Sequence, residues 1–106
     1  MPDERPLHIE IATPDPTTVR AVLKGDLAYD TVAQLAALAP ATGYRLLELD
    51  LSELSFVDSS GLAALIRLHQ QAELADAALR VVALTPHLRG MLRITALDRL
   101  LALPPP

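Results

Sequence analysis

The spacing of apolar and polar residues along this chain predicts both its strands and its helices. Period-two alternation and short apolar runs predict strands at residues 8–12, 18–24, 45–51 and 79–84, with an edge strand at residues 100–103. Helical spacing predicts helices over residues 29–39 and 59–77 and a third beginning at Pro86, which Thr85 can cap. Turn signals at residues 13–16 and at Gly25-Asp26 bound the first two strands, which we expect to pair as a hairpin.

Strands and helices alternate after this hairpin in the order β-β-α-β-α-β-α-β. Alternation of this kind predicts an α/β fold, a mixed sheet of four to five strands with helices packed on it. The run at residues 79–84 is apolar except for Arg80, which is typical of a buried central strand. The expected core residues are Leu47, Leu49 and Val82 in the strands, with Leu65 and Leu68 of the long helix facing the sheet.

Composition fits one domain over residues 1–106, with loose ends at residues 1–6 and 104–106. The chain is 51% hydrophobic but only 3% aromatic, so leucine, alanine, valine and isoleucine must fill its core. There is no cysteine, no signal-peptide pattern and no apolar run of about 18 residues, so we expect a cytoplasmic protein without a membrane span. The net charge is −4 and the basic residues are scattered, which argues against a nucleic-acid partner.

One segment carries distinctive chemistry. An apolar strand leads through a short connection at residues 52–57 to Asp58-Ser59-Ser60-Gly61, where the long helix is predicted to begin. The free N–H groups and the dipole at a helix start favour negative charge. A hydroxyl there can therefore carry a phosphoryl group. Residue chemistry alone favours a simple helix cap at Asp58 or Ser59, with Ser60 and Gly61 filling the first turn, because polar caps are common.

The chain resembles the STAS domains, and within them the anti-sigma factor antagonists of bacteria. The resemblance rests on LSFVDSSGL at residues 54–62, with support from LDLS at 49–52, GDL at 25–27 followed by Thr31, Thr85-Pro86, and LDRL at 97–100. It covers residues 8–103. The DSSG segment in its strand–loop–helix setting is its specific part.

This resemblance implies a partner-switching module. The unmodified domain would bind an anti-sigma factor that is also an ATP-dependent serine kinase. Phosphorylation at Ser59 would break that binding, and a separate phosphatase would restore it. The kinase brings the nucleotide, so the chain itself would need no cofactor.

We expect the partner-binding residues to surround Ser59. Leu62, Ala63 and Ile66 follow it at helical spacing and would share its face, either as a docking patch or packed against a neighbouring loop. The expected partner-binding set is Asp26, Asp58, Ser60, Gly61, Leu62, Ala63 and Ile66. The chain departs from the family in having Ala28 where a further acid is common, and in lacking the usual glycines near residue 76 and at residue 96.

Other functional classes lack their motifs. The three histidines show no metal-ligand spacing, Ser59 is outside a Gly-x-Ser-x-Gly setting, and there is no phosphate-binding glycine loop, so we expect neither an enzyme nor a metal site. A two-component receiver domain would need a lysine after a late strand, and the only lysine is Lys24. The remaining alternative is a STAS domain that is never phosphorylated, acting as a scaffold or as a partner subunit of a membrane transporter.

Overall fold

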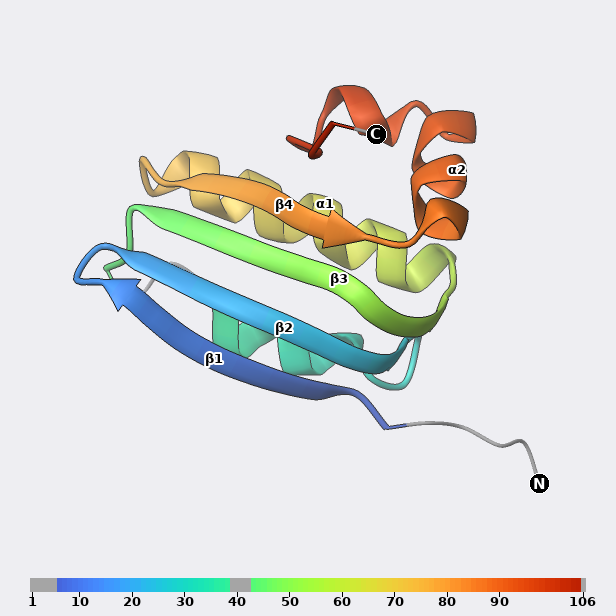
Figure 1. Ribbon diagram of the computed structural model, residues 1–106, viewed down its shortest axis with the longest axis horizontal. Coiled ribbons are helices and arrows are strands. Elements are labelled where there is room, and N and C mark those ends of the chain that lie inside the picture. The colour runs from blue at the N-terminus through green and yellow to red at the C-terminus, as the bar shows by residue number, and fades with distance from the viewer. Residues whose placement is uncertain (1–5, 39–42, 106) are drawn as a thin grey trace.

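The computed structural model describes residues 6–38 and 43–105, which form a four-stranded sheet with helices packed against it (Figure 1). The strands are β1 (His8–Asp15), β2 (Thr18–Leu27), β3 (Leu46–Val57) and β4 (Ala78–Leu84). The helices are α1 (Ser59–Leu74), α2 (Pro86–Ile94) and two 3-10 helices, η1 (Val32–Leu38) and η3 (Leu97–Arg99). The predicted α/β class is confirmed.

The sheet is mixed, and its order follows the chain as β1-β2-β3-β4. β1 and β2 form the expected antiparallel hairpin, whereas β2, β3 and β4 run parallel. Both parallel connections step across the sheet in the same direction, and right-handed crossovers must then lie on the same face. Accordingly, η1 and α1 both lie behind the sheet in Figure 1, and the opposite face is left open.

The core lies between this sheet and its helices. Leu47, Leu49 and Leu51 are at most 1% exposed, and Leu65 and Leu68 of α1 are buried against them, as predicted.

The prediction that Val82 is a core residue was wrong. Val81, not Val82, pairs with Leu49 in the register of β3 and β4, so Val81 is buried and Val82 is only half-buried. Residues 81–84 are all apolar, and alternation within them therefore could not select the inward residue.

Several turn signals lie inside strands. β1 continues through residues 13–15, β2 passes through Gly25-Asp26, and β3 includes the predicted connection at residues 52–57. Register shifts near these positions show that the strands accommodate them as bulges. Gly25 has a φ of +101°, and a Cβ there would lie 2.1 Å from the Pro6 carbonyl oxygen. The glycine thus permits a close backbone approach within a strand.

The helices begin near the predicted positions but are shorter. Residues 32–38 form a 3-10 helix, and Ala39 and Pro40 of the predicted 29–39 helix and its stop lie outside the described residues. α1 ends at Leu74, three residues before the predicted end, and Thr85 caps α2 by accepting from the Leu88 amide at 3.0 Å. Within residues 6–38 and 43–105, no helix is both long and apolar enough to cross a membrane.

The run at residues 79–84, predicted to be a central strand, forms the edge strand β4, and residues 100–103 add only one bridge to it. The Val81 amide donates to the Ala102 carbonyl at 2.8 Å, within a parallel bridge between Arg80 and Ala102. The next donor in a parallel ladder would be the amide of Pro104, and proline has none. The Pro104 carbonyl instead accepts from Arg89 Nη2 at 2.8 Å. The predicted fifth strand therefore stops after its first bridge.

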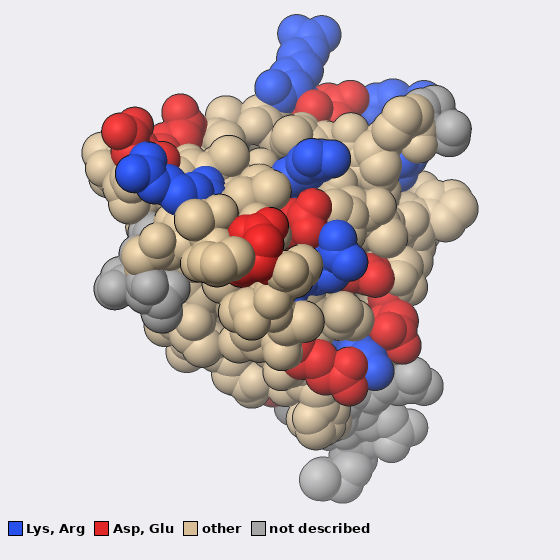
Figure 2. Space-filling view, turned by 60° about the vertical axis from the view of Figure 1, so that its left-hand side comes forward, with Lys and Arg blue, Asp and Glu red and all other residues tan. Residues whose placement is uncertain are grey.

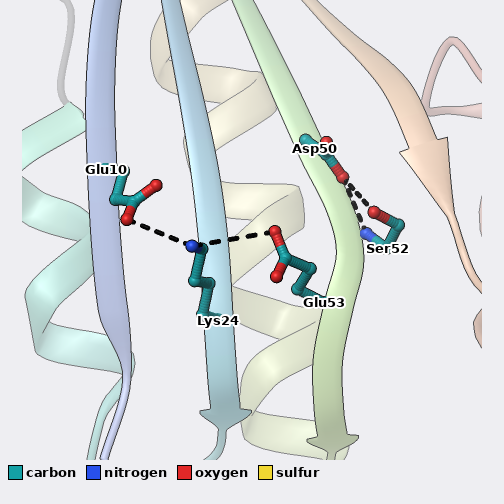
Figure 3. Close-up of polar contacts among 5 residues, drawn as sticks. All are labelled: Glu10, Lys24, Asp50, Ser52 and Glu53. Atoms are coloured by element: carbon teal, nitrogen blue, oxygen red, sulfur yellow. Dashed lines mark hydrogen bonds and ion pairs between the residues drawn. The ribbon is translucent and has the colours of Figure 1, made fainter.

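The open face of the sheet is covered by paired charges. Lys24 Nζ lies 3.1 Å from Glu10 Oε1 and 3.9 Å from Glu53 Oε2, so Lys24 stands between two acids on neighbouring strands (Figure 3). The hydrogen bond to Glu10, together with both negative charges, raises the pKa of Lys24. Acidic and basic side chains are interleaved on the face seen in Figure 2. These paired charges keep the open face of the sheet polar, and neither positive nor negative charge dominates it.

Ala96 occupies the left-handed region, with φ 62° and ψ 14°, where a Cβ is disfavoured. We expect Ala96→Gly to stabilise the domain by about 0.5–1 kcal/mol in urea unfolding. Asp76, at φ 61°, should gain less from the same change because aspartate tolerates this region better. The control Ala63→Gly, within α1, should instead destabilise by about 0.5–1 kcal/mol. Equal effects at residues 63 and 96 would contradict this account.

Candidate functional site

The candidate site lies where the carboxyl ends of β2 and β3 meet the start of α1, at the right-hand end of the sheet in Figure 1. In parallel sheets this edge is the usual place for binding sites, because loops and helix starts converge there. Here the converging segments are residues 26–31, at the end of β2 and in the loop after it, and residues 56–63 around the junction of β3 and α1.

Asp58 connects these two segments. Its Oδ1 accepts from the Gly61 amide at 2.8 Å and caps α1, while its Oδ2 accepts from the Tyr29 amide at 3.1 Å. The Asp58 amide in turn donates to the Leu27 carbonyl at 3.3 Å. Of the two candidate caps, Asp58 is therefore the one used, and its carboxylate also holds the loop that follows β2.

Gly61 allows α1 to approach β2 closely. A Cβ at this position would lie 2.3 Å from the Leu27 carbonyl oxygen and 3.0 Å from Val57 Cγ1. The Leu27 carbonyl is the same group that accepts from Asp58. A side chain at residue 61 would therefore push the first turn of α1 away from the strand that positions it.

Ser59 is the first residue of α1 and its side chain is exposed. Because Asp58 provides the cap, the Ser59 hydroxyl is not needed for it, and no residue in the described ranges forms a hydrogen bond with it. Ser60 is half-buried. Of the two serines, Ser59 is the more exposed.

The predicted docking residues differ in accessibility. Ala63 is exposed and Ile66 is half-buried, whereas Leu62 is only 9% exposed and belongs to the core. Leu62 therefore packs inward, the second of the two roles that the sequence left open for it. An accessible apolar surface at this end includes Ala63 and part of Ile66.

The loop after β2 is held by Thr31. Its buried hydroxyl donates to the Asp26 carbonyl at 2.8 Å and accepts from the Ala28 amide at 2.9 Å. Asp26 is half-buried and Asp30 is exposed, so both lie on the rim of the site. Ala28, where the family often has an acid, is half-buried within this loop.

Sequence reasoning missed two residues of the site, Tyr29 and Phe56. Tyr29 supplies the amide that binds Asp58, and its side chain is 82% exposed. Phe56, two residues before Asp58, is 53% exposed. Composition offered a usable signal. In a chain with only one phenylalanine and two tyrosines, an aromatic residue beside a polar loop is unexpected and therefore worth noting as a candidate surface residue.

The histidines lie apart from one another and from this site. His8 and His87 are exposed, and His69 Nε2 lies 2.7 Å from Glu73 Oε1 within α1. Over residues 6–38 and 43–105, no three histidine, aspartate or glutamate side chains gather where they could hold a metal ion. A hollow of about 250 Å³ lies between η1 and α1, lined in part by Leu35, Leu68 and Arg67, and does not include Ser59.

A matched pair of glycines tests the packing at this junction. In a helix, Gly→Ala ordinarily stabilises by up to about 1 kcal/mol. Gly61→Ala should instead destabilise by about 1–3 kcal/mol because its Cβ overlaps the Leu27 carbonyl. Gly90→Ala in α2 meets no atom within 4 Å and should show the ordinary gain. Thermal and urea unfolding decide the point, and a stabilising Gly61→Ala would contradict the close approach.

Two substitutions separate the functions of the Asp58 carboxylate. Asp58→Ala removes the cap and the bond to the Tyr29 amide, and should cost about 1–2 kcal/mol of stability. Asp58→Asn keeps one oxygen for the Gly61 amide but offers no second acceptor to Tyr29, so its loss should be smaller. Hydrogen exchange at the Tyr29 amide should accelerate in both variants. Unchanged exchange in Asp58→Asn would mean that the second bond does not hold the loop.

Comparisons with known proteins give a consistent result. A family model described as "Mlab, STAS domain" matches residues 12–103. A search of curated proteins found no match.

Among solved structures, an anti-sigma factor antagonist from Mycobacterium paratuberculosis is 23% identical, with 100% of this chain and 90% of that chain covered and a TM-score of 0.80. The anti-sigma factor antagonist SpoIIAA in its unphosphorylated form is 20% identical over 92% of this chain and 89% of its own, with a TM-score of 0.76. The murine anion transporter Slc26a9 in its inward-facing state is 18% identical over 83% of this chain and 15% of its own, with a TM-score of 0.69. At these identities the structures show a shared fold, and the family match extends over most of the sequence. This chain belongs to the STAS domain family.

Proposed function

We propose that this STAS domain is an anti-sigma factor antagonist that works by partner switching. It binds an anti-sigma factor that is also an ATP-dependent serine kinase, and phosphorylation of Ser59 ends this binding. A separate phosphatase restores the unmodified form. The domain acts by binding another protein and catalyses no reaction itself.

The observation that best supports the proposal is the exposure of Ser59. Its side chain is exposed at the first position of α1, while Asp58 performs the capping that the serine might otherwise perform. A hydroxyl with no structural task at a helix start is accessible to a kinase. Its partner-binding neighbours would be Asp26, Asp58, Ser60, Ala63 and Ile66.

The physics of the helix start supports a switch that leaves the fold intact. A phosphoryl group adds about −1.5 to −2 charge at neutral pH. At a helix N-terminus that charge is favoured by a few tenths to about 1 kcal/mol. The modification therefore acts at the partner surface, where the charge must be desolvated on binding and repels any acid that faces it.

A hydrolase with Ser59 as nucleophile has less support. The nearest candidate base on the same helix is His69, ten residues further, which places it about 15 Å away along the axis. His69 Nε2 also lies 2.7 Å from Glu73 Oε1, toward the opposite end of α1 from Ser59.

The second candidate is a STAS domain in a transporter assembly without phosphorylation. The similarity to part of the murine anion transporter Slc26a9 favours it. Incubation of the domain with a cognate kinase and ATP separates the two functions, because only the antagonist should incorporate phosphate.

The central test uses two substitutions at Ser59. Ser59→Ala should fold, bind the kinase and resist modification. Ser59→Asp should fold equally well but bind at least about 10-fold more weakly, which corresponds to about 1.4 kcal/mol. Thermal melts and binding curves measure both effects, with Ser60→Ala as the control that should still accept phosphate at Ser59. The switch at Ser59 is excluded if Ser59→Asp binds like the unmodified domain, or if mass spectrometry finds phosphate only on Ser60.

A further inference from the structure

Two of the few aromatic side chains in this chain are exposed at the end of the sheet where α1 begins. The chain has one phenylalanine, two tyrosines and no tryptophan. Tyr44 is 6% exposed and donates its hydroxyl hydrogen to the Leu38 carbonyl, so it serves the core. Tyr29 and Phe56 are 82% and 53% exposed. Leaving large apolar side chains in water costs about 25 cal/mol for each Å² of apolar surface, and contiguous exposure is typical of an interaction surface.

Backbone contacts bring the two aromatics to the same end of the sheet. Phe56 pairs with Asp26 across β2 and β3, which places their side chains on one face. Tyr29 lies three residues after Asp26, and its amide binds the Asp58 carboxylate. We call the exposed residues at this end of the sheet, Tyr29, Phe56, Ser59 and Ala63, the aromatic patch.

Among the described residues, acids outnumber cations around this patch. Lys24, two residues before Asp26 on the same face of β2, is held between Glu10 and Glu53. Asp26, Asp30 and Asp58 lie on its rim, and neither residues 25–38 nor residues 46–66 contain a lysine or an arginine. α2 also begins at this end of the sheet (Figure 1). Its Arg89, however, is directed to the Pro104 carbonyl at 2.8 Å. A complementary partner therefore needs an apolar centre and a basic rim.

We propose that Tyr29 and Phe56 are the anchors by which this domain docks on its protein partner, and that the partner presents an apolar pocket bordered by arginine and lysine. The proposal rests on the proposed function, because it describes the surface around the same serine. Aromatic side chains commonly dominate binding energy when a partner buries them, and carboxylates at the rim mainly accelerate encounter and select the partner.

This arrangement also explains how one phosphoryl group could end binding. Ser59 belongs to the patch inside the acidic rim, so the added charge would lie opposite the partner's apolar pocket. The partner's cations face the rim, whereas Ser59 would lie against the apolar centre. The phosphoryl group would have to lose its water there without gaining a cation.

Photo-crosslinking in cells of the source organism tests the surface and identifies the partner in the same step. Benzophenone side chains are placed in the full chain at residues 29 and 56 and, as controls, at Leu74 and Ile94, the last residues of α1 and α2, which are 89% and 87% exposed. Residues 29 and 56 should crosslink to one and the same protein, through peptides that contain apolar and basic residues. The controls should not capture it. Capture from residues 74 and 94 as well, no product from 29 and 56, or an acidic contact peptide would overturn the proposal.

Affinity measurements with the captured protein complete the test. Tyr29→Ala and Phe56→Ala should each weaken binding by about 30-fold or more, and Leu74→Ala and Ile94→Ala by less than about 2-fold. Asp30→Lys should slow association, whereas Glu73→Lys, at the far end of α1, should not. Thermal melts establish that each variant is folded. If the captured protein is not a kinase, the proposed function fails while the docking surface stands; if Ser59→Asp weakens binding but the aromatic variants do not, only the docking surface fails.

Discussion

The Asp58 carboxylate links the two segments on which the site is built. One oxygen caps α1 through the Gly61 amide, and the other holds the Tyr29 amide of the loop after β2. Gly61 permits this junction because any side chain there would overlap the Leu27 carbonyl. Since these contacts set the start of α1, they also set where Ser59 lies and which way it is exposed. Position and accessibility of the candidate phosphoacceptor thus depend on the aspartate beside it.

A second constraint is the handedness of the two crossovers. Because both step in the same direction across the sheet, η1 and α1 cover the same face and leave the other open. The open face is solvated by pairs such as Lys24 with Glu10 and Arg20 with Glu48. The same geometry brings the loop after β2 and the start of α1 to one edge, where a protein partner can contact both.

The chemistry at that edge suits binding better than catalysis. Ser59 is exposed, Asp58 is occupied by two backbone amides, and His69 forms its contact with Glu73 toward the other end of α1. The surface around the serine combines exposed aromatic side chains with carboxylates. In the proposed function, this surface recognises a protein partner, and a charge added at Ser59 changes what it can bind.

The sequence by itself determined the element types, the core leucines and the DSSG helix start. Period-two spacing identified Leu47 and Leu49, helical spacing identified Leu65 and Leu68, and local hydrogen-bonding chemistry identified a cap at Asp58 or Ser59. These features are local, so a single chain segment contains the information. Only the tertiary structure decided between the two caps, because the second acceptor of Asp58 is used by an amide 29 residues away in sequence.

Tertiary structure also decided what no local pattern could. Val81 replaces Val82 in the core because of the register with Leu49, and β4 becomes an edge because Pro104 cannot donate to it. β3 continues through residues 52–57 because pairing with β2 satisfies its backbone despite polar residues. Tyr29 and Phe56 lie at the same end of the sheet because β2 and β3 are neighbours in it. Register, edges and shared surfaces are properties of two segments at once, and they exist only when the segments pack together.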